Sequence, residues 1–172
     1  MGQLDHDQVM RHRTDFPLVL VCDGVNGPAN IGSLLRLADG FGVKEVIFSN
    51  AAINMQSDRM KRTARGSEKW VNWREESDLI NFLRSKLKSG AFVWALEITD
   101  RSTPLAKMRV ENTDKEIVMV IGGENRGVSS EVLQLIEDQV YHLPLFGRNS
   151  SINVSQAAAI GLYHIVRQFQ TK

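Results

Sequence analysis

The segment Leu143-Pro144-Leu145-Phe146-Gly147-Arg148-Asn149-Ser150-Ser151-Ile152-Asn153-Val154-Ser155 starts with apolar residues, passes through a glycine and polar turn, and continues into an apolar pattern at helical spacing. This order predicts a strand, a turn and a helix that opens between Ser151 and Asn153. The first N–H groups of a helix have no partners inside it, and the Ser and Asn side chains add hydroxyl and amide groups there. Such a junction can hold a ligand with its backbone, although an ordinary capped helix would use the same residues.

Two other segments have the same design. Residues 18–22 form a short apolar run, after which the chain passes through a turn and Asn30-Ile31-Gly32 into a helical pattern that contains Arg36. Residues 116–121 lead into Gly122-Gly123-Glu124-Asn125-Arg126-Gly127, and a helix-start signal follows at 129–131. Three predicted strand ends therefore carry glycine, asparagine, serine and at least one charged residue each.

The periodicity of the apolar residues predicts an α/β fold with a mostly parallel sheet flanked by helices. By length we expect a single domain over residues 1–172, with residues 1–16 as a short N-terminal lead. The predicted strands are Leu18–Cys22, Glu45–Phe48, Ala91–Leu96, Ile117–Ile121 and Val140–Leu145, and the predicted helices are Asn30–Phe41, Ser77–Lys88, Ser129–Glu137 and Asn153–Gln168. Pattern alone, with the general rule against threaded chains, would predict an unknotted sheet.

In order and spacing, the three segments resemble the three signature motifs of the SpoU/TrmH family of RNA 2′-O-ribose methyltransferases, in the SPOUT class. The first motif is matched by Asn30-Ile31-Gly32 with Arg36, the second by Gly122, Glu124 and Gly127, and the third by Leu143-Pro144 and residues 151–155. The resemblance implies a C-terminal trefoil knot and a homodimer with its active sites at the subunit boundary. It also implies methyl transfer from S-adenosylmethionine to a ribose 2′-hydroxyl of RNA, with S-adenosylhomocysteine as the product.

The resemblance further implies roles for individual residues. Arg36 would be the central catalytic residue, and because a guanidinium keeps its proton, we expect it to bind an RNA phosphate and stabilise developing alkoxide character. Asn30 and Asn153 would orient Arg36 and the ribose. Glu124 would fix Arg36 or balance charge near the sulfonium, and Ser151 would hold the phosphate or cap the helix. The residues implied to line the cofactor pocket are Leu96, Gly122, Leu143 and Ile152, of which Gly122 would allow close approach because it lacks a Cβ.

Two clusters of basic residues are candidates for RNA contact. The first is Arg11-His12-Arg13, and the second surrounds a turn of small residues at 63–67 and comprises Arg59, Lys61, Arg62, Arg65 and Lys69. The net charge of the chain is only +1, so attraction for nucleic acid depends on such local clusters. We expect contacts to RNA from Arg11, Arg13, Arg62 and Arg65, although lysine and arginine are exposed in most proteins whatever their role.

Composition narrows the setting in which the protein works. The single cysteine, Cys22, excludes an internal disulfide and is typical of a reducing compartment. No apolar run approaches the roughly twenty residues that cross a bilayer. The four histidines show no spacing typical of metal ligands. We therefore expect a cytoplasmic protein that contacts neither a membrane nor a metal ion.

Two other functions stay open from the sequence. One is a catalytically silent SPOUT-like module that binds RNA or pairs with an active subunit. The other is a small nucleotide-binding α/β enzyme of another type, which the absence of the glycine-rich patterns of dinucleotide-binding and P-loop enzymes disfavours. Within the methyltransferase hypothesis, we expect tRNA rather than ribosomal RNA as the substrate, because the sequence shows no appended RNA-binding domain.

Overall fold

The structure is a computed structural model, and it describes residues 14–170 of the chain. Seven strands form one sheet in the order β3-β2-β1-β6-β4-β7-β5, and every neighbouring pair of strands is parallel. The predicted fold class is therefore confirmed. The strands are β1 (Phe16–Asp23), β2 (Val43–Ser49), β3 (Trp73–Glu76), β4 (Phe92–Leu96), β5 (Thr103–Pro104), β6 (Ile117–Gly122) and β7 (Val140–His142).

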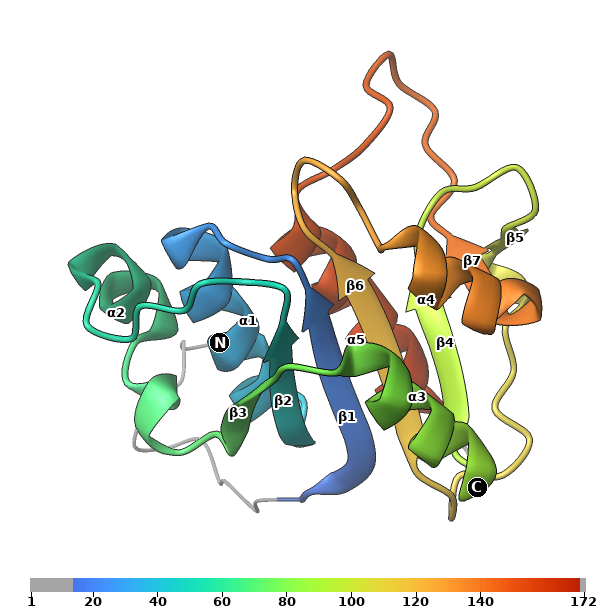
Figure 1. The fold of residues 1–172 in the computed structure, drawn as a ribbon, viewed down its shortest axis with the longest axis horizontal. Coiled ribbons are helices and arrows are strands. Elements are labelled where there is room, and N and C mark those ends of the chain that lie inside the picture. Colours follow the sequence, from blue (N-terminus) through green and yellow to red (C-terminus); the bar gives the residue numbers. More distant parts are fainter. Residues whose placement is uncertain (1–13, 171–172) are drawn as a thin grey trace, which may run out of the picture.

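Helices cover both faces of the sheet (Figure 1). Helices α1, α2 and α5 pack on one face, and α3 and α4 pack on the other. The helices are α1 (Pro28–Gly40), α2 (Asp58–Ala64), α3 (Leu79–Lys88), α4 (Ser130–Leu135) and α5 (Val154–Gln170), and short 3-10 turns occur at Ser67–Lys69, Leu105–Lys107 and Glu137–Gln139.

The central strands are apolar along their whole length because both of their faces are covered. In β1, Leu20 and Cys22 face the α1, α2 and α5 layer, whereas Val19 and Val21 face the α3 and α4 layer. Continuous apolar runs of this kind are typical of buried parallel strands. The same property made these strands visible in the sequence.

Several predicted boundaries were wrong. Strand β7 ends at His142 rather than at Leu145. Its pairing with β4 and β5 together spans only Val140–His142, and Pro144 has no N–H to donate. The helix predicted from Ser129 to Glu137 ends at Leu135 and continues as a 3-10 turn. Helix α2 and strands β3 and β5 were not predicted, since they are short and carry few buried side chains. The trefoil knot and the homodimer stay predictions.

All seven strands run in the same direction, so their carboxyl ends lie at one edge of the sheet. The loops that follow β6 and β7 rise above this edge in Figure 1, and α5 then returns along the face that α1 covers. The strand order changes direction at β1: β2 and β3 lie on one side of it, and β6 and the remaining strands lie on the other. In open α/β sheets such a change of direction at the carboxyl ends is the usual place for a ligand site.

Candidate active site

A cavity of about 450 Å³ opens at this edge, between the ends of β4, β6 and β7 and the first turn of α5. Its size is within the range of small-molecule sites, about 300–1,000 Å³. All four residues predicted to bind the cofactor line it, together with three of the five predicted catalytic residues. They are Leu96, Gly122, Leu143 and Ile152, and Glu124, Ser151 and Asn153.

A chain of side-chain hydrogen bonds joins the three predicted motifs. The Asn153 Nδ2 donates to Asn30 Oδ1 at 3.0 Å, and the Asn30 Nδ2 donates to Glu124 Oε1. These residues come from the start of α5, the first turn of α1 and the loop after β6, and they are separated by 123 and 94 positions along the chain. The hydrogen-bond partner of Glu124 in this structure is therefore Asn30. Of the two roles expected for Glu124, a contact with Arg36 is not formed in the single chain, and the balance of charge near the sulfonium stays a prediction.

Asn153 also begins helix α5. Its Oδ1 accepts hydrogen bonds from the Ser155 backbone N–H at 2.9 Å and from the Ser155 Oγ at 2.6 Å, while its backbone carbonyl accepts the first helical bond from Ala157. Asn153 is thus the N-cap, and the helix starts at Val154 rather than between Ser151 and Asn153. Ser151 does not cap the helix, because Asn153 already occupies that position; it is exposed and lines the cavity.

Arg36 lies outside the cavity. It is an exposed residue of α1, whose buried side, including Leu35 and Ala38, packs into the core. Asn30 stands at the start of the same helix and reaches the site through Glu124 and Asn153. The structure therefore brings Asn30, Glu124 and Asn153 together and leaves Arg36 facing solvent in the single chain.

The packing of the chain around Gly122 gives a reason for glycine that the sequence did not show. A Cβ at this position would overlap the backbone atoms of Gly127 and Val128. The loop after β6 folds back on the strand end, where Gly123 and Gly127 form an antiparallel bridge and Gly127 N–H donates to the Gly123 carbonyl at 2.9 Å. Close packing of the chain on itself is therefore enough to exclude a side chain at Gly122, and the close approach of the cofactor at this position stays a prediction.

Two carboxylates bind backbone N–H groups around the loop that follows β6, and neither was predicted from the sequence. Asp23, only 2% exposed, accepts from the Ser129 N–H at 2.8 Å and from the Asn50 Nδ2 at 2.7 Å. Glu97 accepts from the Val128 N–H and from the Ile98 N–H, each at 2.9 Å. The available signal was an acidic residue directly after a fully apolar strand, at the end of β1 and of β4. The sequence could not show which N–H groups these carboxylates bind.

The charge of the cavity is negative. Glu97 and Glu124 both line it, and within residues 14–170 no lysine or arginine does. One side of the cavity also carries His142, whose Nδ1 lies 3.0 Å from the Ser102 Oγ. Carboxylates without a compensating cation favour a positively charged ligand, whereas a phosphate-bearing ligand would be repelled.

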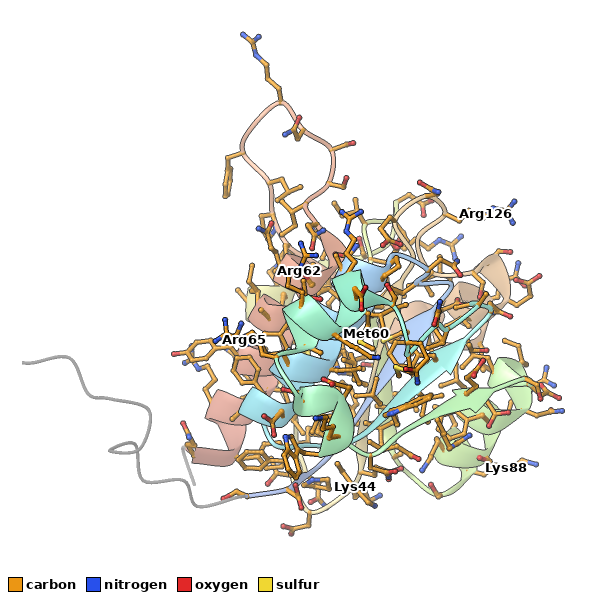
Figure 2. All side chains as sticks on the ribbon, turned by 90° about the vertical axis from the view of Figure 1, so that its left-hand side faces the viewer. Lys44, Met60, Arg62, Arg65, Lys88 and Arg126 are labelled. Carbon is orange, nitrogen blue, oxygen red and sulfur yellow. The ribbon has the colours of Figure 1, made fainter. Side chains whose placement is uncertain are left out.

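Two of the predicted RNA-binding arginines, Arg62 and Arg65, do not line this cavity. Arg62 and Arg65 extend from the end of α2 (Figure 2), and both are exposed. Arg11 and Arg13 lie outside the described residues. Within residues 14–170, no helix is long and apolar enough to span a membrane. In the same part of the chain, no group of three or more His, Cys, Asp or Glu residues is arranged to hold a metal ion.

Comparison with known proteins matches residues 17–163 to the model of the SpoU rRNA Methylase family. The chain belongs to the SpoU rRNA methylase family. A tRNA (guanosine(18)-2′-O)-methyltransferase of Thermus thermophilus is 30% identical over 162 residues, which cover 94% of this chain and 80% of that protein. A 23S rRNA (guanosine-2′-O-)-methyltransferase of Burkholderia sp is 32% identical over 152 residues, covering 88% of this chain and 60% of that protein.

The fold agrees with this membership. A crystal structure of an A. aeolicus TrmH/SpoU tRNA modifying enzyme superposes with a TM-score of 0.80 at 26% identity, covering 92% of this chain and 78% of that one. The SpoU resemblance and the SPOUT-type parallel sheet are therefore confirmed, and the chain is a methyltransferase of this family.

Proposed function

We propose that this SpoU methylase transfers the methyl group of S-adenosylmethionine to a ribose 2′-hydroxyl of RNA, with tRNA favoured over ribosomal RNA. The observation that carries the proposal is the hydrogen-bonded set Asn153, Asn30 and Glu124, which lies at a cavity suited to a cationic small molecule. The names of the two relatives support the reaction type, since both act on a guanosine 2′-oxygen, one in tRNA and one in 23S rRNA.

The residues of the cavity fit S-adenosylmethionine, which when bound supplies an electrophilic methyl group on a positively charged sulfur. The apolar side chains of Leu96, Leu143 and Ile152 would cover the faces of the adenine ring, and nearby backbone groups would bind its polar edges. Glu97 and Glu124 provide negative charge for the sulfonium and the ammonium group. ATP and NAD fit less well, because their phosphates would face these carboxylates without a lysine or arginine.

The three joined side chains have distinct tasks in this proposal. Asn30 holds the Glu124 carboxylate at the cavity, where its charge opposes the positive charge of the donor. Asn153 fixes the Asn30 amide from the other side, and its own amide is oriented by the cap of α5. Ser151, exposed at the cavity, is placed to contact the ribose or its phosphate. Together they would orient the 2′-hydroxyl for attack on the methyl carbon.

Arg36 requires a second subunit in this proposal. In the single chain its side chain is exposed and does not line the cavity. We infer that Arg36 acts at the subunit boundary of a homodimer, where it binds an RNA phosphate. A guanidinium is a cation with hydrogen-bond donors and no acceptor, so Arg36 would stabilise negative charge developing on the ribose oxygen instead of removing the proton.

The test is a transfer assay with S-adenosylmethionine carrying a tritiated methyl group, using separate tRNA and rRNA transcripts. A 2′-O-methyl group blocks cleavage of the adjacent phosphodiester by alkali, so the product is recovered as alkali-resistant labelled dinucleotide. We expect label in tRNA. Arg36→Ala should abolish transfer and leave the Kd for S-adenosylmethionine, measured by calorimetry, within about twofold. Arg84→Ala, an exposed arginine of α3, serves as the matched control and should transfer at the wild-type rate.

Each alternative has its own outcome. Binding of S-adenosylmethionine and RNA without transfer would identify a catalytically silent module. Saturable heat with ATP or NAD but none with S-adenosylmethionine would identify a nucleotide-binding enzyme of another type. Label in rRNA alone would reverse the expected substrate, and near-wild-type transfer by Arg36→Ala would show that the role given to this arginine is wrong.

A further inference from the structure

Trp70 exposes an unusually large aromatic surface. It is 64% exposed, whereas Trp94 is fully buried, and Trp73 packs edge to face with Phe48 at 6.4 Å between ring centroids. Indole rings contribute strongly to recognition because they offer a wide, flat apolar face at low conformational entropy cost. The described part of the protein leaves most of this face uncovered, so the ring is free to contact a partner.

The backbone holds the indole in a defined position. After α2, Arg65 and Gly66 both take left-handed conformations, with φ of 56° and 94°, and the chain reverses into the short turn Ser67–Lys69. The Trp70 N–H donates to the Ser67 carbonyl at 3.0 Å. The indole Nε1 lies 3.9 Å from the place that a Cβ on Gly66 would take. The Nε1 edge of the ring therefore lies near the glycine turn that follows α2.

Positive charge is concentrated in the segment that leads to this ring. Residues 57–70 contain five lysine and arginine residues against two acidic ones, a net charge of +3, whereas the whole chain carries only +1. Figure 2 shows Arg62 and Arg65 extending from α2 on the same side of the molecule. Among residues 14–170, no ion pair joins Arg62, Arg65 or Lys69 to a carboxylate. Their charge is available to an external anion.

We propose that Trp70, Arg62, Arg65 and Lys69 form an RNA-binding surface, which we call the Trp70 surface. An unpaired base of the substrate stacks on the indole, and the flanking phosphates bind the arginines. An exposed aromatic ring flanked by unpaired cations is the combination that binds single-stranded RNA. The proposal rests on the RNA substrate of the proposed function, and it adds residues that do not line the cavity.

A second copy of the chain is a poorer occupant for this surface. If these residues lay on the axis of a twofold symmetric dimer, the patch would contact itself, and a local charge of +3 would face another +3. RNA instead brings one negative charge per nucleotide and a flat apolar base. Charge and shape therefore both favour RNA over self-association at the Trp70 surface.

The test measures binding of bulk tRNA to the full-length protein, with Trp70→Ala, Trp70→Phe and the control Leu87→Ala, which removes an exposed apolar side chain from α3. Loss of one stacked base should weaken tRNA binding about 10-fold in Trp70→Ala. Trp70→Phe keeps an aromatic face and should bind within about threefold of wild type. Saturating tRNA should quench the wild-type tryptophan fluorescence and quench the Phe variant much less, because Trp94 is buried and Trp73 is only partly exposed.

The phosphate contacts have a separate readout. In Arg62→Ala, the slope of log K against log salt concentration should fall by about 0.7, the release expected from one phosphate contact on a single strand. Arg84→Ala should leave the slope unchanged. Calorimetry with S-adenosylmethionine should give the wild-type Kd for the Trp70 and Arg62 variants, because neither residue lines the cavity.

Three results would overturn the proposal. One is tRNA binding by Trp70→Ala within twofold of wild type. Another is a change in oligomeric state of Trp70→Ala in light scattering, which would assign the surface to contact between copies of the chain. The third is a wild-type protein that does not bind tRNA or rRNA at all, an outcome that would also reject the proposed function. The first result, together with normal methyl transfer by Trp70→Ala, would reject the Trp70 surface and leave the proposed function in place.

Discussion

Replacing Asp23 with asparagine tests the loop that carries Glu124. The Asp23 carboxylate uses both of its oxygens, one for the Ser129 N–H at 2.8 Å and the other for the Asn50 Nδ2 at 2.7 Å. An ionised carboxylate only accepts hydrogen bonds, whereas asparagine has one accepting oxygen and one NH₂ group that donates. Whichever way the new amide turns, its NH₂ group therefore faces an N–H donor in a site that is 2% exposed.

The expected cost follows from these two bonds. A hydrogen bond to a charged group contributes about 1.5–3 kcal/mol, and a buried donor left without a partner costs about 1–3 kcal/mol. These contributions overlap, so we expect Asp23→Asn to lower the free energy of unfolding by about 2–4 kcal/mol. For a chain of this size that corresponds to a Tm about 10 °C lower. S-adenosylmethionine should also bind more weakly, because the same loop lines the cavity.

Urea unfolding followed by circular dichroism measures this change. The control is Glu137→Gln, since Glu137 is 63% exposed and lies 3.6 Å from the Arg101 guanidinium. Exposed pairs of this kind contribute little, so the control should stay within about 0.5 kcal/mol of wild type. If Asp23→Asn unfolds at the same urea concentration as the control, the two hydrogen bonds do not hold the loop, and Asp23 has no part in positioning Glu124.

Three further outcomes are expected. Gly122→Ala places a Cβ against facing backbone and should lower the free energy of unfolding by about 3 kcal/mol. The control Gly40→Ala has open space around it and should be neutral or slightly stabilising. Equal urea midpoints for the two variants would contradict this. The Cys22 thiol is fully buried, and burial raises its pKa. It should therefore react with a disulfide reagent only at the rate at which the protein unfolds. Fast labelling of the native protein would disprove this. The hydrogen bond from Arg74 lowers the pKa of Glu76, so this pair stabilises the fold above the ordinary glutamate pKa and loses that contribution as pH falls through the lowered value. Glu76→Gln should therefore flatten the acid side of the plot of unfolding free energy against pH. An unchanged plot would reject the contribution of the pair.

The sequence alone was sufficient for the features that depend on local pattern. Apolar runs such as Leu18–Cys22 predicted central strands because both of their faces are buried. The glycine, asparagine and charged residues at three strand ends identified the family, and parallel strands necessarily place those ends at one edge. The same reasoning missed α2 and β3, where polar and charged residues predominate and few side chains enter the core.

Only the tertiary structure decided which groups meet. The order of the strands brings Asn30, Glu124 and Asn153 into hydrogen-bond contact across 94 and 123 positions, and no local pattern contains that information. It also showed that Gly122 is a glycine because the facing loop would collide with a side chain, and that Arg36 stays outside the cavity of its own chain. Periodicity records whether a residue is buried, whereas the partner of a polar group depends on where distant segments are placed by the packing of the sheet and its helices.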